Sequence, residues 1–331
     1  MRYLVTGGAG FIGSNIVKKL VEQGEEVIVL DNLSTGKEKN LLEVINKIQF
    51  IKGNLLDKKM VEKAVKDVDY VIHQAALPSV KRSVENPEMS LKNIVNATLN
   101  LFIACLNEKS IKRIVQAASS SAYGNTEKLP KIETIYPAPR SVYAASKLTQ
   151  EFLASAFYYS YGIEIISLRY FNVFGPNQDY NSPYSAVIPK FMDAAINNKE
   201  IVIYGDGTIT RDFTYVENVV NANLLACKCK WTGAPEVMNI GTGNMISLND
   251  LVKEIEKITN TSLTPKYTTE RIGDVKSSLA DIDKAKKILG YYPNVDFHEG
   301  VKKLYDWKLK NERREIWKVF YFVEVGEVQK F

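Results

Sequence analysis

Tyr143 and Lys147 are the two residues whose types and spacing most directly predict acid–base chemistry. Of the 18 tyrosines in the chain, Tyr143 alone is followed by a lysine four residues later. On a helix, residues four positions apart lie on the same face. An ammonium group beside a phenol stabilises the phenolate and lowers the pKa of the phenol from about 10, so the pair predicts a general base. A surface tyrosine with a lysine lying beside it is the alternative interpretation.

Three consecutive serines form a second group of polar side chains that could bind a substrate. Ser119, Ser120 and Ser121 follow an apolar segment over 112–118 that is predicted to be a strand. A hydroxyl group at the end of a buried strand is well placed to hydrogen-bond a substrate oxygen. The same serines could instead form an ordinary polar turn, and position alone does not rank the three.

A glycine-rich segment near the N-terminus predicts a site for a dinucleotide. Gly7, Gly10 and Gly13 lie between an apolar strand over 2–5 and a helix that runs to about Gly24. Glycine permits a tight turn and lets a pyrophosphate approach the backbone, while the helix N-terminus supplies amide donors. Because glycine also serves tight turns that bind nothing, the strand–turn–helix context carries this prediction.

Asp31 indicates which dinucleotide would bind. It ends the second predicted strand, about 20 residues after the glycines, where a carboxylate accepts hydrogen bonds from ribose hydroxyls and repels a 2′-phosphate. We therefore expect NAD rather than NADP, with a helix cap or a turn as the alternative role of this aspartate. Asn54 and Leu55 follow the third strand, where we expect the adenine edge.

Short apolar strands alternate with amphipathic helices over the first half of the chain, which predicts a parallel sheet covered on both faces. The expected fold class is α/β: a Rossmann-type doubly wound parallel sheet with a smaller C-terminal α/β substrate-binding domain. Ligands of such folds bind beyond the carboxyl ends of the strands. The strands are expected near 2–5, 27–30, 48–52, 69–72, 112–118 and 164–169, and later helices near 57–65, 88–108, 143–161, 186–198, 216–230, 247–259, 281–289 and 297–311.

The regular alternation ends after the last of these strands, and we expect two domains. The dinucleotide-binding domain is predicted to cover 1–170 and to regain about 212–240 from later in the chain. The substrate domain is expected over 171–211 and 241–311, followed by a tail, 312–331, to which we assign no role.

The composition excludes several classes of partner and site. With 43 basic and 38 acidic residues the formal net charge is +5, and the basic residues are scattered rather than gathered, so no nucleic-acid partner is expected. Three cysteines and two histidines are too few for a zinc-finger ligand set, and no metal site is expected. Sparse cysteines and the lack of a long apolar segment predict a cytoplasmic protein without a membrane span.

Together, the motifs resemble the extended short-chain dehydrogenase/reductase family, which contains the NAD-dependent sugar-nucleotide epimerases and dehydratases. The resemblance covers the chain to about residue 310 and rests on TGGAGFIG, DNLSTG, HQAA, SSSAYG, YAASK, LRYFNVFGP and TRDFTYV. It implies the fold, bound NAD and a catalytic set of Ser119, Tyr143 and Lys147. It also implies a homodimer in which the helices near 88–108 and 143–161 pair across the dimer axis.

The resemblance extends the expected sites residue by residue. For NAD, the expected residues are Gly7, Gly10, Phe11, Ile12, Gly13, Asp31, Asn32, Ser34, Thr35, Gly36, Asn54, Leu55, Gln74, Ala75, Ala76, Asn93, Tyr143, Lys147 and Tyr170. For a UDP-sugar, they are Pro78, Ser119, Ser120, Ser121, Tyr143, Asn172, Gln178, Ala186, Val187, Tyr204, Arg211, Arg271, Asp274 and Ser278. The two arginines suit the pyrophosphate, because the guanidinium fork can bind two phosphate oxygens; a surface ion pair is the alternative for each.

Ser120 and Ser121 bear on the type of reaction. The hexose dehydratases of this family carry an Asp–Glu pair at these two positions, and a hydroxyl cannot replace a carboxylate as an acid or base at neutral pH. Dehydration is therefore not expected. The resemblance implies a 4-epimerase: Tyr143 takes the proton of the 4-hydroxyl, hydride passes from C4 to NAD, and hydride returns to the other face of the 4-keto sugar. Lys147 would also hold the nicotinamide ribose, and the positive nicotinamide of NAD⁺ would add to the lowering effect of Lys147 on the pKa of Tyr143.

Position 278 carries the prediction of the sugar. Bacterial UDP-glucose 4-epimerases often place a bulky tyrosine four residues after the aspartate of an Arg-x-Gly-Asp motif, where this chain has Ser278. A small residue leaves room for a 2-acetamido group, and the segment with Gln178 and Ala186 is similar to that of UDP-N-acetylglucosamine 4-epimerases. Pro78 departs from the glycine that is usual there. We expect UDP-N-acetylglucosamine and UDP-N-acetylgalactosamine, and leave UDP-glucose and UDP-galactose open as further substrates.

Three alternatives stay open. One is a UDP-glucose 4-epimerase with little use for acetamido sugars. A second is a UDP-glucuronate epimerase or decarboxylase, which would need a cationic partner for the sugar carboxylate that the sequence does not identify. The third is a non-catalytic NAD-binding protein, against which the intact Ser119, Tyr143 and Lys147 argue.

Overall fold

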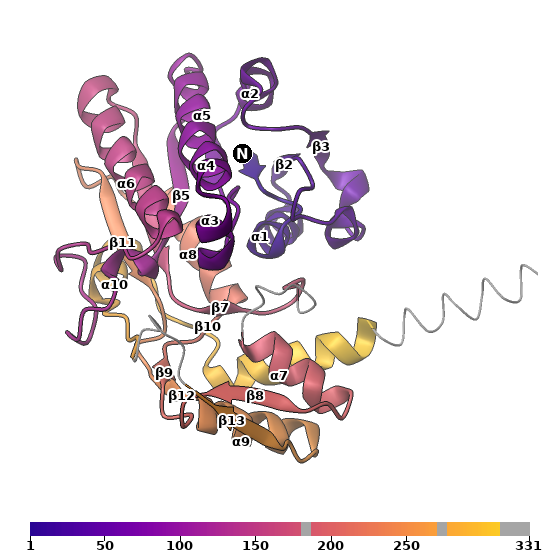
Figure 1. The fold of residues 1–331 in the computed structure, drawn as a ribbon. Helices are drawn as coiled ribbons and strands as arrows, with labels where there is room; N and C mark the ends of the chain where they lie inside the picture. Colours follow the sequence, from indigo (N-terminus) through magenta and orange to yellow (C-terminus); the bar gives the residue numbers. More distant parts are fainter. Residues whose placement is uncertain (180–186, 270–276, 312–331) are drawn as a thin grey trace, which may run out of the picture.

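A seven-stranded parallel sheet forms the centre of the molecule (Figure 1). The structure is a computed structural model and describes residues 1–179, 187–269 and 277–311. The predicted fold class is confirmed. The strand order is β11-β6-β5-β4-β1-β2-β3. The order reverses between β1 and β4, and such a switch point opens a crevice at the carboxyl ends of the strands. The strands are β1 (Arg2–Thr6), β2 (Glu26–Asp31), β3 (Gln49–Lys52), β4 (Tyr70–His73), β5 (Arg113–Ser119), β6 (Ile165–Tyr170) and β11 (Glu236–Ile240).

Side chains that alternate along each strand enter two separate cores, one on each face of the sheet. Val5 and Val29 pack on the face that α1 and α8 cover, whereas Leu4 and Ile28 pack on the face covered by α2, α5 and α6. Both faces are thus fully covered, which explains why the strands read as continuous apolar runs. The covering helices are α1 (Phe11–Glu22), α2 (Lys58–Val65), α5 (Ala97–Leu106), α6 (Val142–Tyr161) and α8 (Val216–Lys228).

The helix predicted near 88–108 is present as one helical stretch, Pro87–Leu106, but it is not a regular α-helix throughout. It contains α4 (Pro87–Leu91), a π-helical turn η3 (Lys92–Asn96) and α5, and the unpredicted helix α3 (Val80–Glu85) precedes it. Both α3 and α4 are too short to produce a helical period in the sequence. A π turn inserts an extra residue and is frequent at functional sites. This one carries Asn93.

One helical stretch of the described part, Pro87–Leu106, is long and apolar enough to cross a membrane. Leu101 and Phe102 of this stretch are fully buried against the sheet and α6. Core packing therefore accounts for part of its apolar composition, and a single stretch of this kind is weak evidence for a membrane span.

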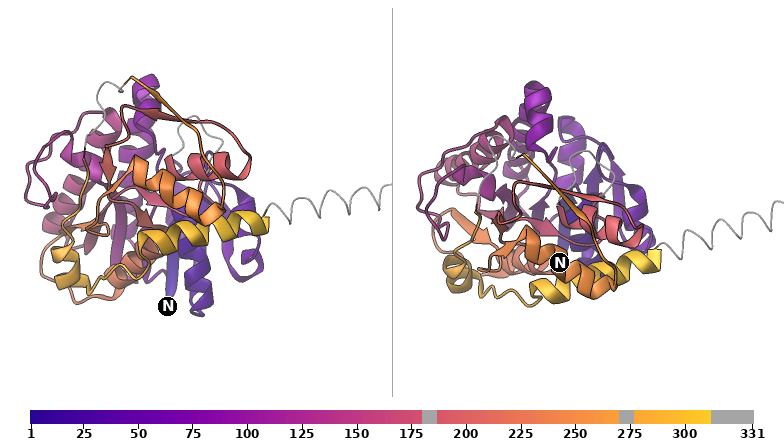
Figure 2. Two further views of the ribbon diagram at one scale, coloured as in Figure 1. Left: turned by 90° about the horizontal axis from the view of Figure 1, so that it is seen from below. Right: turned by 60° about the horizontal axis from the view of Figure 1, so that its bottom comes forward.

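The later elements gather at one end of the main sheet (Figures 1 and 2). The segment expected to return, 212–240, contains α8 and β11, and β11 pairs in parallel with β6. The domain boundaries themselves stay a prediction. The remaining elements are β7 (Val173–Phe174), β8 (Ile201–Tyr204), β9 (Thr210–Arg211), β10 (Thr214–Tyr215), β12 (Ile246–Ser247), β13 (Pro265–Thr268), α7 (Val187–Ile196), α9 (Leu248–Thr259), α10 (Asp283–Leu289), a helix over 297–311, and the 3-10 turns η1 (Glu38–Leu41), η2 (Ile45–Lys47) and η4 (Ser120–Tyr123).

Candidate active site

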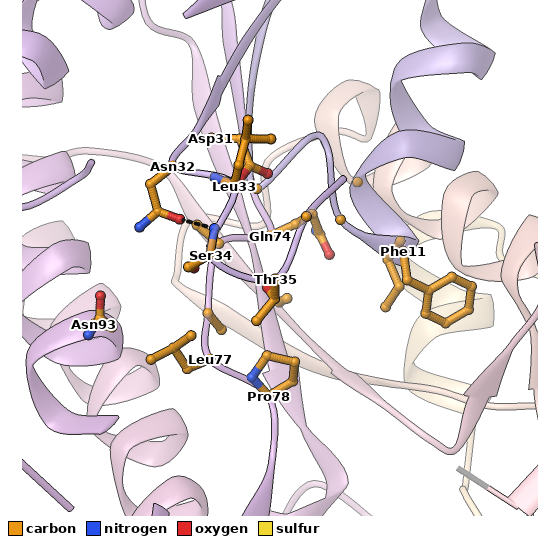
Figure 3. A pocket seen from close by; sticks show the side chains of 18 of the residues that line it. Phe11, Asp31, Asn32, Leu33, Ser34, Thr35, Gln74, Leu77, Pro78 and Asn93 are labelled. Atoms are coloured by element: carbon orange, nitrogen blue, oxygen red, sulfur yellow. Dashed lines mark hydrogen bonds between the residues drawn. The ribbon is translucent and has the colours of Figure 1, made fainter. Parts of the chain in front are cut away.

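A cavity of about 660 Å³ opens at the carboxyl ends of β1, β2, β4, β5 and β6. Every residue expected to bind NAD lines it, from Gly7 through Tyr170. Figure 3 shows how Asp31, Gln74 and Thr35 lie between Phe11 on one side and Asn93 on the other. The structure therefore brings together residues that are far apart in sequence.

The glycines of the first turn are packed so tightly that a side chain would not fit. A Cβ on Gly13 would lie 2.2 Å from the carbonyl oxygen of Gly7, and a Cβ on Gly7 would lie 2.7 Å from the backbone nitrogen of Ala75. Gly7 also has a φ of +68°, which favours glycine. Gly10 caps α1 without any side-chain hydrogen bond, so the first amide groups of α1 are left for a ligand. The glycine turn and the N-terminus of α1, which together we call the glycine cradle, fit a pyrophosphate.

Asp31 joins the glycine turn to the loop after β2. Its Oδ2 atom accepts a hydrogen bond from the Ala9 backbone amide at 2.9 Å, and Oδ1 accepts one from the Leu33 amide at 2.8 Å. Burial raises the pKa of this carboxyl against the lowering effect of the two amides. Since each oxygen has a second lone pair, Asp31 can still accept hydrogen bonds from a ribose. It therefore shapes the loop in addition to its expected role.

Tyr143 and Lys147 lie on one face of α6 and both line the cavity. Ser141 caps this helix by accepting a hydrogen bond from the Ala144 amide at 3.1 Å, which fixes where the helix begins and hence where Tyr143 points. The Lys147 ammonium is buried and donates to the Ala117 carbonyl at 2.8 Å. Burial lowers the pKa of Lys147 to about 8, against the raising effect of Glu151.

The pKa of the Tyr143 phenol lies above its ordinary value. Burial raises its pKa, and a hydrogen bond with Ser119 opposes this only in part. Lys147 donates to a backbone carbonyl of β5. The two side chains share a helix face as expected, whereas a lowering of the phenol pKa by Lys147 together with the positive nicotinamide of NAD stays a prediction.

The structure separates the three serines by their contacts. Ser119 ends β5, and its Oγ atom accepts from the Ser121 amide at 3.2 Å and lies 2.8 Å from the Ser121 hydroxyl. Ser119 is also the serine that contacts the Tyr143 phenol. Ser120 has neither contact. Position in the sequence could not make this distinction, because it depends on the 3-10 turn η4 that follows the strand.

The expected substrate residues are more dispersed. Pro78, Tyr143 and Gln178 line the cavity, and Gln178 donates to the Val173 carbonyl at 3.1 Å. Arg211 and Ser278 meet at one edge of the second domain, where the Ser278 amide donates to the Thr210 carbonyl at 3.2 Å. Ser119, Ser120, Ser121, Asn172, Val187, Tyr204, Arg211 and Ser278 do not line the cavity, while Ala186, Arg271 and Asp274 lie outside the described residues.

Tyr170 is held at the wall of the cavity by a residue that sequence reasoning missed. Its hydroxyl accepts hydrogen bonds from Asn223 Nδ2 at 2.8 Å and Gln74 Nε2 at 3.0 Å. Asn223 lies on α8 and reaches the site only because α8 returns to the main sheet. Nothing in the residues around Asn223 signals this role. Asn223 itself does not line the cavity; the lining residues that were not predicted are Leu30, Leu33, Lys37, Asn40, Gly53, Leu77, Arg82, Ala97, Ala117, Ala118, Val173, Asn177 and Asp179.

The segment after β7 packs against the first residues of α1, next to the glycine turn. Asn177 donates to the Ser14 hydroxyl at 3.0 Å, and Asn15 donates to the Pro176 carbonyl at 3.1 Å. Lys37 and Asp179, which both line the cavity, form an ion pair at 3.3 Å. The two halves of the molecule are thus joined at the side of the cavity where the glycines lie.

His73 lies below the cavity and is unsuited to acid–base chemistry there. It is buried between the hydroxyls of Thr6 at 2.7 Å and Thr98 at 2.9 Å. Burial and the charge of Lys147 lower its pKa to about 3, so it is neutral at physiological pH. Among the residues that the structure describes, no group of three His, Cys, Asp or Glu side chains could hold a metal ion.

Comparison with known proteins gives consistent matches along most of the chain. The pattern of the GDP-mannose 4,6 dehydratase family matches residues 4–304. A putative UDP-glucose 4-epimerase of Methanocaldococcus jannaschii is 41% identical over 94% of this chain and 99% of that protein. The structure of a UDP-N-acetylglucosamine 4-epimerase from Methanobrevibacter ruminantium M1, in complex with UDP-N-acetylmuramic acid, has a TM-score of 0.89 and 41% identity, covering 94% of this chain and 98% of that one. A UDP-glucose 4-epimerase of Thermus thermophilus, in complex with NAD, has a TM-score of 0.84 and 35% identity, covering 93% and 98%.

Proposed function

Because the chain belongs to the extended short-chain dehydrogenase/reductase family of NAD-dependent sugar-nucleotide epimerases and dehydratases, we propose that it is an NAD-dependent 4-epimerase of UDP-hexoses. The preferred pair is UDP-N-acetylglucosamine and UDP-N-acetylgalactosamine. The observation that carries this proposal is the convergence of Ser119, Tyr143 and Lys147 beside a cavity that fits a dinucleotide.

The cavity fits NAD through its shape and its polar groups. The glycine cradle and the N-terminus of α1 would hold the pyrophosphate, Asp31 the adenosine ribose, and Lys147 the nicotinamide ribose. Tyr170, fixed by Asn223, would lie on the carboxamide side. When bound, NAD supplies reversible hydride chemistry at C4 of the sugar. The complex of the Thermus thermophilus enzyme with NAD supports this assignment.

Tyr143 would act as the base that removes the proton of the 4-hydroxyl. Burial raises its pKa, so the phenol needs positive charge close by before it can give up its proton at neutral pH. Lys147 supplies one such charge from the same helix face. Ser119 contacts the phenol and can hold the sugar oxygen in line with it. The same groups return the proton when the sugar is reduced on its other face.

The residues after Ser119 disfavour elimination of water, although the matching family pattern bears the name of a dehydratase. Ser121 is bound to Ser119 at 2.8 Å, and Ser120 is the other side chain of this turn. Neither hydroxyl can serve as a general acid or base at neutral pH. The turn therefore supports epimerisation, for which a single base on a helix and a hydride carrier suffice.

The acetamido sugars are favoured by the small side chain at position 278. Ser278 is 9% exposed and its backbone is held by Thr210, next to Arg211. A 2-acetamido group needs space that a bulkier side chain would occupy. The complex of the Methanobrevibacter ruminantium epimerase with an N-acetylated UDP-sugar is in keeping with this preference. A UDP-glucose 4-epimerase, or a UDP-glucuronate enzyme, is the second candidate.

A panel of UDP-sugars incubated with the purified protein tests the proposal. We expect interconversion of the two N-acetylated UDP-hexoses without net consumption of NAD. NMR of the anomeric protons would measure this interconversion. Conversion of UDP-glucose alone would support the second candidate. If no UDP-hexose is converted by protein that carries NAD, the proposed activity is wrong.

We further propose a cytoplasmic homodimer. Its interface would lie on the outer faces of α4, α5 and α6, where Leu91, Ile103 and Phe152 are exposed apolar residues. All three cysteines are free, which suits a reducing compartment. Sedimentation of the wild type against Phe152→Glu tests the dimer: a change from dimer to monomer is expected, and an unchanged monomer in both would overturn it.

A further inference from the structure

Helix α6 carries a third ionisable side chain in register with Tyr143 and Lys147. Glu151 follows Lys147 by one further turn, so the three residues occupy one face of the helix. Glu151 and Arg169 of β6 have side chains that are each only 4% exposed. Arg169 donates through Nε to one carboxylate oxygen at 2.9 Å and through Nη2 to the other at 2.7 Å. The carboxylate is therefore held in a bidentate pair.

The surroundings of Arg169 fix this pair in place. The guanidinium lies over the ring of Tyr123 with 4.7 Å between the guanidinium carbon and the ring centroid. The Tyr123 hydroxyl in turn donates to Asn239 Oδ1 at 2.7 Å. Three elements, β6, η4 and β11, thus hold the pair rigidly. A buried ion pair is a weak contributor to stability and is often replaceable by apolar residues, so its presence beside the site calls for another explanation.

The charge of Lys147 depends on its neighbours, because burial disfavours the ammonium form. Its hydrogen-bond acceptor, the Ala117 carbonyl of β5, is neutral. His73 of β4 is neutral as well, since its pKa is about 3, and the Tyr143 phenol is uncharged until it loses its proton. Among the described residues, Glu151 is the anion that raises the pKa of Lys147.

We propose that the Glu151–Arg169 pair keeps Lys147 in its ammonium form, with Glu151 as a positioning residue for the epimerase reaction. Glu151 lies one turn from Lys147 on α6, whereas Arg169 lies on β6 and donates to that carboxylate. Because Glu151 shares the helix face with Lys147 and raises its pKa, the pair acts on the lysine mainly through the carboxylate. Arg169 holds the Glu151 carboxylate in place through two hydrogen bonds. The catalytic part of this inference rests on the proposed function.

The titration of Lys147 itself tests the proposal without any substrate. Protein labelled with carbon-13 at the lysine ε position would be titrated by NMR, with the Lys147 signal assigned by its loss in Lys147→Arg. The pKa of about 8 should persist in Glu151→Asp, which keeps the charge. In Glu151→Gln it should fall by about 1 or more, because the anion is lost while Arg169 remains.

Glu151→Gln leaves Arg169 buried without its partner and could fail to fold. The double variant Glu151→Gln/Arg169→Gln removes both charges and keeps two amides of similar size. Because the pair acts on the lysine mainly through the carboxylate, its Lys147 pKa should lie between those of the wild type and Glu151→Gln. The matched control is Glu164→Gln, which removes the charge of the carboxylate whose Oε2 atom accepts two hydrogen bonds from Arg113 elsewhere on the sheet, and it should leave the Lys147 titration unchanged.

An unchanged Lys147 pKa in the folded double variant would overturn the proposal, as would an equal fall in Glu164→Gln. If the pKa shifts as expected, the alkaline limb of the kcat profile should move to lower pH by the same amount. A purely structural role would lower kcat without moving that limb. If Lys147 titrates as expected and no UDP-sugar is converted even by the wild type, the proposed function is wrong. The effect of the Glu151–Arg169 pair on the charge of Lys147 is then still supported.

Discussion

The two halves of the site differ in how far they are formed by local sequence. In the cofactor half, the glycine turn follows β1, Asp31 ends β2, and Tyr143 and Lys147 lie on one helix. All of these residues line a single cavity. In the substrate half, Arg211 and Ser278 approach each other from distant segments and lie off that cavity. A parallel sheet aligns the ends of its strands, so the first kind of site is positioned by the fold itself. The second depends on how separate loops pack.

Tyr143→Phe at the junction of the two halves should have the largest effect. It removes the hydroxyl that exchanges the proton and keeps the ring, so we expect kcat to fall by roughly 10²- to 10⁴-fold while NAD stays bound. Epimerisation of UDP-N-acetylglucosamine by NMR and the ratio of NAD to protein after gel filtration would measure the two effects. Native activity in this variant would contradict the mechanism. Tyr158→Phe, on the same helix but remote from the cavity, is the control.

Gly13→Ala should break the cofactor half selectively. The new Cβ would meet the Gly7 carbonyl at 2.2 Å, so the turn must shift and the amide donors of α1 move with it. A displacement of about 1 Å at such a site can cost about 10²-fold, and we expect NAD affinity to fall by that order. Calorimetry with NAD would measure the change.

Gly162→Ala serves as the contrast, because a Cβ at this position, just after α6, would meet nothing within 4 Å. Its left-handed φ of +77° would cost some stability, but NAD affinity should be unchanged. Equal NAD affinity in Gly13→Ala and the wild type would mean that the glycine turn is not the pyrophosphate site.

This difference between the halves also sets what the sequence could predict. The α/β fold, the glycine turn and the shared face of Tyr143 and Lys147 follow from local periodicity and spacing, and the structure contains all of them. The contact that fixes Tyr170 could not be predicted, because Asn223 comes from a helix 50 or so residues later that returns to the sheet. The raised pKa of Tyr143 was also out of reach, because burial is a tertiary property.

Ser278→Tyr addresses the less predictable half. If position 278 limits the size of the sugar, the larger side chain should lower kcat/KM for UDP-N-acetylglucosamine roughly tenfold more than for UDP-glucose. Assays of both substrates with wild type, Ser278→Tyr and Ser278→Ala would measure this, with thermal melts as a check on folding because Ser278 is buried. Equal losses on both substrates would show that the size argument is wrong.

The smallest effect is expected where the two halves meet, at the ion pair between Lys37 and Asp179. The side chains are 47% and 42% exposed, and exposed pairs are worth about 0–1 kcal/mol. Because both residues line the cavity beside the glycine turn, Lys37→Gln should speed NAD release by at most about fivefold at low salt, and added salt should erase the difference. Lys18→Gln is the matched control, since its ion pair with Glu43 lies away from the cavity. If both variants release NAD at the wild-type rate, the hydrogen bonds of Asn15 and Asn177 suffice to join the halves without the ion pair.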